Sequence, residues 1–170
     1  ADNGIVDLYA VWTADTYSII YKNMENAVNA EDNLTEFTLE DNLITLHDPS
    51  KAGYTFDGWY ADSAFTKKVS NTITLDAAHD WIFYAKWTAN QYVITFDSCL
   101  GITVPTETQM MMYDNETQLT LVSEMGKFNR PGYTFAGWSR EEGGAVEFTD
   151  GQTVKNVAEK GNVTLYAVWD

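Results

Sequence analysis

The chain has 170 residues and a net charge of −15, from 25 Asp and Glu against 10 Lys and Arg. This charge argues against nucleic acid or an anionic membrane surface as a partner, because both attract a positively charged surface. Cys99 is the single cysteine, which excludes an internal disulfide and a thiolate metal site. No apolar run approaches the roughly 18 residues of a membrane-spanning helix, and no signal peptide opens the sequence.

The N-terminal segment contains a phrase that returns twice along the chain. Its copies are Tyr9-Ala10-Val11-Trp12, Tyr84-Ala85-Lys86-Trp87 and Tyr166-Ala167-Val168-Trp169. Alternation along a strand places Leu8, Ala10 and Trp12 on one face, and we expect the face that carries Trp to be the core face. Residues 1–14 are therefore interpreted as the last strand of a preceding, truncated repeat. On this interpretation the sequence is a piece of a longer protein.

Two pairs of strands are predicted next, because β-forming side chains alternate with polar ones. The predicted first strands are residues 17–21 and 92–96, and the predicted second strands are residues 35–39 and 109–113. Two further apolar segments follow, at residues 42–46 and 119–125. They are too short for periodicity to decide between a strand and a single helical turn.

A seven-residue signature occurs twice, with six of its seven positions identical. The copies are Gly53-Tyr54-Thr55-Phe56-Asp57-Gly58-Trp59 and Gly132-Tyr133-Thr134-Phe135-Ala136-Gly137-Trp138. Pro and Gly before each copy predict a turn that leads into a strand. A glycine inside a strand often marks a β-bulge, so we expect a bulge at Gly58 that rotates Trp59. Variable excursions, residues 61–80 and 139–162, then lead to the closing strands.

The two signatures lie 79 residues apart, which predicts two complete repeat units at residues 15–89 and 90–170. Units of about 80 residues bury only about 60% of their unfolded surface, so we expect each to be helped by its neighbour. Four residues without Gly or Pro connect Trp87 to Tyr92. A connection this short, and unlike a flexible linker, predicts units arranged end to end as a semi-rigid rod.

The order of these motifs resembles the Listeria-Bacteroides repeat, also called the internalin B-type B-repeat. The resemblance rests on Gly-Tyr-Thr-Phe-x-Gly-Trp, on the closing Tyr-Ala-x-Trp and on an opening Tyr-x-Ile-x-Phe/Tyr, and it covers residues 17–169 with a fragment at 5–12. It implies a mainly β fold, α+β at most, of tandem small β-grasp-like units on bacterial surface or secreted proteins, with no known catalysis. One departure follows the first strand, where the family often has Asn-Gly-Gly and this chain has Lys22-Asn23-Met24-Glu25 and Asp97-Ser98-Cys99-Leu100-Gly101.

Few residues suggest catalysis. His47 and His79 occupy non-equivalent places in the first repeat, and the second repeat has no histidine, so we interpret both as surface or turn residues. Cys99 lacks a flanking catalytic signature and is expected to be a small, half-buried residue. We therefore predict that the chain is not an enzyme and that it has no catalytic residue and no cofactor.

Calcium is the best metal candidate for an acidic extracellular protein, but no Asp-x-Asp-x-Asp-Gly loop is present. The short acidic turns are Glu31-Asp32-Asn33 and Asp150-Gly151-Gln152. We predict no metal site, and the alternative is an ordered structural cation at one of these turns.

The aromatic residues separate into two groups. Those that recur in register, and are therefore expected in a shared core, are Trp59, Trp87, Trp138 and Trp169. Trp81 and Tyr60 do not recur and are candidates for a local surface role. Met110-Met111-Met112 alternates within a predicted strand, so at least one Met should face outward, and packing on an edge strand is favoured over partner binding.

These observations predict a non-enzymatic, monomeric tandem-repeat module that acts as a semi-rigid stalk or spacer in a bacterial surface or secreted protein. The alternative is an adhesion module that binds a host or cell-surface protein or glycan through its loops or an exposed strand edge. The spacer is favoured because the motifs that repeat have the character of a core, and the segments that differ between the repeats are loops. Loops, however, also carry most binding residues. The expected location is extracellular, neighbouring repeats are expected partners, and no ligand-binding residue is assigned.

Overall fold

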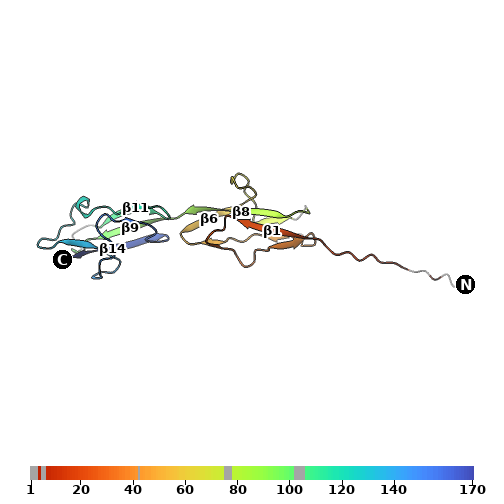
Figure 1. Ribbon diagram of the computed structural model, residues 1–170, viewed down its shortest axis with the longest axis horizontal. Helices are drawn as coiled ribbons and strands as arrows, with labels where there is room; N and C mark the ends of the chain where they lie inside the picture. The colour runs from red at the N-terminus through yellow and green to blue at the C-terminus, as the bar shows by residue number, and fades with distance from the viewer. Residues whose placement is uncertain (1–3, 5–6, 42, 75–77, 102–105) are drawn as a thin grey trace. The chain divides into compact units, whose positions relative to one another are not determined.

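The computed structural model describes residues 4, 7–41, 43–74, 78–101 and 106–170 (Figure 1). The chain divides into two compact units, one formed by Ala1–Pro49 with Asp57–Lys86 and the other by Ser50–Phe56 with Trp87–Asp170. In the described ranges the regular structure consists of β-strands and one short 3-10 turn. The mainly β fold expected from the alternating strands is thereby confirmed.

The chain contains two sheets of four strands with the same order, and each sheet belongs mainly to one unit. In the first sheet the neighbours are β3 (Glu36–Thr38), β1 (Thr16–Lys22), β8 (Trp81–Ala89) and β6 (Tyr54–Tyr60). In the second they are β10 (Glu107–Met112), β9 (Gln91–Asp97), β14 (Gly161–Trp169) and β12 (Phe135–Ser139). All the strands predicted in the repeated motifs of the two units therefore exist, and corresponding motifs take corresponding places.

The central pair of each sheet is parallel, and it joins the first strand to the closing strand. The second strand pairs antiparallel with the first, as β3 does with β1 and β10 with β9. A parallel pair needs a long crossover connection, and the signature strand and the variable excursions lie within this crossover. The arrangement is compatible with the β-grasp-like unit that the family resemblance implies.

Shorter strands complete the units. They are β2 (Ala27–Val28), β4 (Leu43–Thr45), β5 (Ser50–Lys51), β7 (Thr72–Thr74), β11 (Thr117–Gln118) and β13 (Thr153–Val154). The two apolar segments that periodicity left ambiguous take different forms. The first forms β4, which pairs antiparallel with β7, whereas the second contains the 3-10 turn Val122–Glu124.

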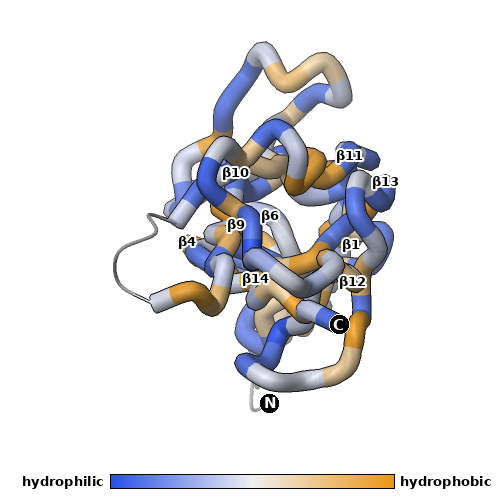
Figure 2. The backbone as a smooth tube through the Cα atoms, turned by 90° about the vertical axis from the view of Figure 1, so that its left-hand side faces the viewer, coloured by the Kyte–Doolittle hydropathy of each residue, from blue (hydrophilic) through white to orange (hydrophobic). Residues whose placement is uncertain are grey.

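Alternation along the first strands places one face of each sheet in the core. Tyr92, Ile94 and Phe96 of β9 are at most 1% exposed. The parallel register pairs Phe96 with Leu165, so two fully buried side chains lie next to each other on the same face. Figure 2 shows hydrophobic and hydrophilic residues following one another along the chain instead of gathering in long runs. The burial of every second residue in β9, and of Leu165 and Ala167 in β14, supports the assignment of the Trp-bearing face to the core.

The glycine inside the signature strand produces the expected bulge. Gly137 has a φ of 148°, and the pairing of β12 with β14 shifts register between Phe135 and Gly137. Trp138 follows and is fully buried. In the first unit Gly58 has a φ of 134° and Trp59 is likewise fully buried. In the second unit the bulge thus turns the tryptophan into the core, while the bulge predicted at Gly58 stays a prediction.

The N-terminal copy of the closing phrase is exposed to solvent. Residues 7–15 form no strand, and the side chains of Leu8, Tyr9, Val11 and Trp12 are 86–92% exposed. The identical phrase in β14 lies between β9 and β12, where Leu165 is fully buried. The assignment of residues 1–14 to a preceding repeat stays a prediction, as does the end-to-end arrangement of the units.

Candidate functional site

The two histidines are surface residues, as predicted. His47 is exposed, and its backbone carbonyl accepts hydrogen bonds from Asn33 Nδ2 and from Trp59 Nε1. His79 is also exposed, and its ring stacks on Trp81 at a centroid distance of 5.1 Å. His47 therefore holds a turn through its backbone, while the imidazole of His79 covers an aromatic ring.

Cys99 is half-buried, as expected, and has a φ of 56°. Its backbone N–H donates to Asp97 Oδ1 at 2.8 Å, which stabilises the turn after β9. Burial raises the pKa of the Cys99 thiol, and the nearby Asp97 carboxylate acts in the same direction. The residue therefore stays a thiol near neutral pH and is a weak nucleophile.

The acidic turns use their polar atoms to hold backbone. Asp150 Oδ1 accepts from Val122 N–H at 2.9 Å, and Gln152 Oε1 accepts from Thr149 N–H at 2.9 Å. In the other turn Asn33 is buried and bonds in both directions with the backbone of His47. Within the described ranges, no three His, Cys, Asp or Glu side chains come close enough together to hold a metal ion.

The recurring tryptophans lie in or against the cores. Trp59 and Trp138 are fully buried, while Trp87 and Trp169 are partly buried. Trp169 Nε1 donates to the carbonyl of Ser98 at 2.9 Å, which ties the closing strand to the turn after the first strand. Both partly buried tryptophans also contact the phenylalanine of a signature strand edge-on, so this contact is shared by the two repeats.

The surface role expected for Tyr60 is wrong. Tyr60 is 9% exposed, and its ring packs edge-on against Phe65 at 5.5 Å. Its counterpart Ser139 is buried as well, at 1% exposure, so the position is internal in both units although its residue type changes. Trp81 is half-buried between His79 and Phe83.

The methionines lie on an edge strand, as predicted. β10 is the outer strand of its sheet, with Met111 buried and with Met110 and Met112 exposed at 68% and 45%. This alternation leaves two apolar side chains on the solvent side of the second unit.

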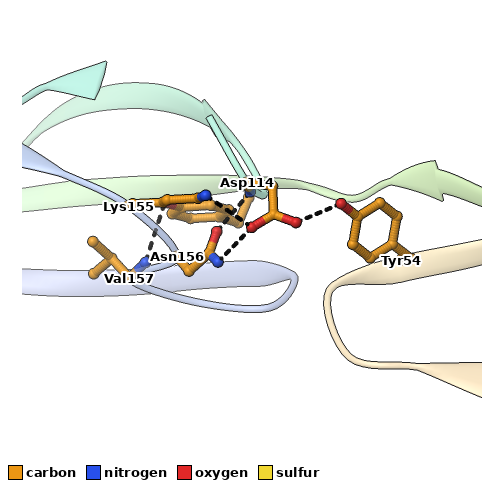
Figure 3. Close-up of polar contacts among 6 residues, drawn as sticks. Tyr54, Asp114, Lys155, Asn156 and Val157 are labelled. Carbon is orange, nitrogen blue, oxygen red and sulfur yellow. Dashed lines mark hydrogen bonds and ion pairs between the residues drawn. The ribbon is translucent and has the colours of Figure 1, made fainter. Parts of the chain in front are cut away.

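A polar cluster in the second unit centres on Asp114 (Figure 3). The Asp114 carboxylate accepts hydrogen bonds from the Tyr54 hydroxyl and from Asn156 Nδ2, and it pairs with Lys155 Nζ at 3.3 Å. The Asp114 N–H donates back to Asn156 Oδ1 at 2.6 Å. One carboxylate thereby connects the signature strand, the turn after β10 and the turn after β13.

The cluster shifts the acidity of its members in opposite directions. The Tyr54 hydroxyl, the Asn156 amide and the Lys155 ammonium stabilise the carboxylate and lower the pKa of Asp114 to about 2. The same hydrogen bond to Asp114 raises the pKa of Tyr54. The arrangement is a structural clamp that keeps Asp114 charged, which is the opposite of what a general acid would require.

We predict that the second unit loses stability as the pH falls from about 4 to about 2. A carboxylate with a lowered folded pKa stabilises the fold above its unfolded pKa of about 3.9, and this contribution is lost as the pH falls through the folded pKa. Acid titration monitored by amide NMR signals of β9 would measure it. Asp114→Asn should flatten the dependence in this window. Asp32→Asn, a matched loss of charge in the first unit, should leave it in place, and equal effects of both variants would contradict the prediction.

Each unit also has an open pocket, and the two occupy corresponding places. In the first unit a pocket of about 330 Å³ is lined by Lys22, Asn23, Glu25, Ser63, Phe65 and Tyr84. In the second a pocket of about 360 Å³ is lined by Cys99, Arg130, Glu142, Gly143, Gly144, Ala167, Val168 and Trp169. Both combine the turn after the first strand, the excursion after the signature strand and the closing strand.

The sequence patterns identify neither the Asp114 cluster nor the pocket residues. Neither set recurs between the repeats, so self-similarity carries no signal for them. A local signal existed for the first pocket: Asp62 begins its excursion, and Asp often caps a turn by accepting backbone N–H bonds. Its carboxylate does accept bonds from Ala64, Thr66 and Lys67.

Comparison with protein families gives two matches to the Listeria-Bacteroides repeat domain, at residues 17–86 and 92–168. A provisionally named Gly-rich membrane protein of Evansella cellulosilytica is 27% identical over 167 residues, which is 97% of this chain and 17% of that protein. Internalin H of Listeria monocytogenes is 36% identical over 119 residues, which is 70% of this chain and 20% of that protein. The chain thus spans no more than 20% of the length of either relative. No helix in the described ranges is long and apolar enough to span a membrane.

Proposed function

The chain belongs to the Listeria-Bacteroides repeat domain family, and on this basis we propose that it is a semi-rigid spacer in a bacterial surface or secreted protein. Its relatives are an internalin and a membrane protein, each about five times longer than the matched region or more. In this role the repeats hold other parts of the parent protein at a distance from the cell. The role needs no catalysis.

The path of the chain through its two compact units is the observation that carries the proposal. Residues 50–56 lie inside the first family match, yet they belong to the second compact unit. The chain therefore passes from one unit to the other three times, after Pro49, Phe56 and Lys86. A pair of independent domains on a flexible linker would need one passage. We infer from the three passages that the folding of one unit depends on the other, which is what a spacer of coupled repeats requires.

The connection between successive strands supports the same proposal. β8 ends at Ala89 and β9 begins at Gln91, so a single residue separates them. Asn90 is itself held in the second unit, because its N–H donates to the Gly53 carbonyl at 2.9 Å and its carbonyl accepts from Tyr113 N–H at 2.9 Å. A hydrogen-bonded residue between two strands has little of the freedom that a Gly/Ser linker provides.

Small-angle X-ray scattering would test the spacer. The chain should fit one narrow distribution of dimensions, and a variant with six Gly/Ser residues inserted after Asn90 should fit a broader one. The insertion replaces no residue of the chain and lengthens only the connection between β8 and β9. Equal breadth for the two proteins would contradict a semi-rigid spacer.

An adhesion module is the second candidate function, and the exposed edge of β10 favours it. Met110 and Met112 are adaptable apolar side chains on a strand whose outer backbone groups can pair with a further strand. A binding partner would raise the unfolding temperature further as its concentration increases, with a logarithmic dependence, whereas a pure spacer has no such partner.

A further inference from the structure

The pocket of the first unit differs from its counterpart in what lines it. Glycine residues, Cys99 and one aromatic residue, Trp169, line the second pocket, whereas two aromatic residues, Phe65 and Tyr84, line the first. Because both pockets are formed by the same three segments of the fold, the place of the pocket is a feature of the repeat. The pair of aromatic residues formed by Phe65 and Tyr84 is found in the first pocket and not in the second, and it therefore requires its own explanation.

Phe65 occupies its place at a conformational cost. Its φ is 56°, a left-handed conformation that is unfavourable for a bulky residue. The corresponding excursion of the second unit uses Gly143, with a φ of 72°, for a left-handed turn. Glycine would therefore serve the turn better than Phe65 does. Strained residues of this kind gather at functional sites, where the side chain is the reason for the strain.

The turn holds the Phe65 ring in a defined position. Asp62 accepts backbone hydrogen bonds from Ala64, Thr66 and Lys67, and Phe65 N–H donates to the Asp62 carbonyl at 3.2 Å. On one side the Phe65 ring packs edge-on against Tyr60. The rigid turn means that a ligand placed on this ring would not have to order it first.

Polar groups of both kinds surround the aromatic pair. The Lys22 ammonium is a donor, the Glu25 carboxylate is an acceptor, and the Ser63 hydroxyl is both. Among the described residues, Lys22 and Glu25 form no ion pair with each other or with another side chain. Both side chains are exposed and able to turn toward a ligand.

We propose that this pocket binds one hexopyranose ring of a glycan. The apolar C–H face of the sugar packs on Phe65 and Tyr84, and its hydroxyl groups bond with Lys22, Glu25 and Ser63. Sugar hydroxyls donate and accept at once, which matches a lining that offers both functions. A volume of about 330 Å³ lies at the lower end of the range for small-molecule sites and suits a single ring.

A neutral sugar fits this lining better than an anionic one. Glu25 lies in the pocket itself, and the whole chain has a net charge of −15, so an anionic ligand would be repelled. Lys86 is not a lining residue, and its ammonium lies over the Tyr60 ring at 5.3 Å and over the Phe65 ring at 6.0 Å. The proposal does not depend on the spacer function, because either result of the scattering experiment leaves the pocket in place.

An amide NMR titration of the 170-residue chain with the methyl glycosides of glucose, galactose, mannose and N-acetylglucosamine tests the proposal. At least one glycoside should cause saturable shifts confined to residues 22–25, 62–66 and 84, with a dissociation constant on the order of millimolar for so small a ligand. Absence of saturable shifts at these residues for all four glycosides would overturn it.

Variants at position 65 sharpen the test. Phe65→Gly removes the ring and relieves the left-handed strain, so the fold should persist while binding weakens at least about fivefold. Phe65→Tyr keeps the ring and should retain binding. Tyr133→Ala removes a 50% exposed ring from the second unit and should bind like the parent chain. Binding that is equally strong in Phe65→Gly would show that the sugar lies elsewhere and would overturn the proposal.

Discussion

Trp138→Ala is expected to destabilise the second unit by about 3 to 5 kcal/mol, the usual range for removing a buried large aromatic side chain. Trp138 is fully buried, and its ring contacts Phe96 at 4.8 Å, Phe135 at 4.9 Å and Phe128 at 6.1 Å. The substitution leaves a cavity among three rings, which belong to different parts of the unit and cannot all move inward. Small domains have total stabilities of about 5 to 15 kcal/mol, so this loss removes a large fraction of the total.

Urea denaturation followed by near-ultraviolet circular dichroism would measure this loss. Tyr133→Ala is the matched control, because it removes an aromatic ring that lies five residues earlier and is 50% exposed. Its ring lies against the guanidinium of Arg130 at 3.7 Å, a surface contact whose loss should cost less than about 1 kcal/mol. If the two variants lost similar stability, the ring cluster around Trp138 would not be the centre of the core.

The fold was predictable from the sequence where the chain repeats itself. Trp59 and Trp138 each end a copy of the seven-residue signature, directly after its second glycine, and both are fully buried. Recurrence carries this information because a shared core needs the same side chains at the same strand positions. The alternation in residues 92–96 was equally informative, since burial on one face of a strand has a period of two.

Prediction failed where a position keeps its burial and changes its residue. Tyr60 and Ser139 are both buried, but one is large and aromatic and the other is small and polar. The difference is absorbed by the excursions, which supply Phe65 against Tyr60 in the first unit. A comparison of residue types between the two repeats cannot detect this exchange. The space available at each position is set by contacts with segments that lie elsewhere in the sequence.

The Asp114 cluster and the position of Phe65 in the first pocket could not be predicted for a related reason. Tyr54 and Asp114 are 60 residues apart, and their contact depends on the turn conformations at Asp114 and Asn156, with φ values of 62° and 55°. Phe65 occupies a left-handed position that sequence preferences assign to glycine or asparagine. Only the folded chain places these side chains where they can act together.

The second large effect is expected for Gly137→Ala, which should destabilise the second unit by about 3 kcal/mol, at the upper end of the cost of backbone strain. The φ of Gly137 is 148°, which is unfavourable for alanine. A Cβ there would lie 2.6 Å from the carbonyl oxygen of Phe148 and 2.5 Å from Val146 Cγ1. That carbonyl accepts the backbone hydrogen bond of Trp138 at 2.8 Å, so it cannot withdraw without breaking the bulge.

Gly58→Ala, the same change at the same motif position of the first unit, should cost only about 1 to 2 kcal/mol. Its φ of 134° imposes a backbone strain that accounts for most of this cost. The obstacle differs, because a Cβ there would meet Lys68 Cε at 2.5 Å, near the far end of a flexible side chain. Lys68 can swing away at the loss of its hydrogen bond to the Asp57 carbonyl.

Urea denaturation of both variants, with Gly126→Ala as the control, would separate strain from steric obstruction. Gly126 has a φ of 58° and no described atom within 4 Å of the position that an alanine methyl group would take, so its substitution reports backbone strain alone, about 1 kcal/mol. The expected order of cost is Gly137→Ala, then Gly58→Ala, then Gly126→Ala. A cost at Gly58 equal to that at Gly137 would mean that strain alone fixes this glycine, and that the Phe148 carbonyl moves freely. The predicted order instead makes the bulge of the second unit the more rigid of the two. The atom that would clash with a methyl group there belongs to the backbone, whereas in the first unit it belongs to a lysine side chain.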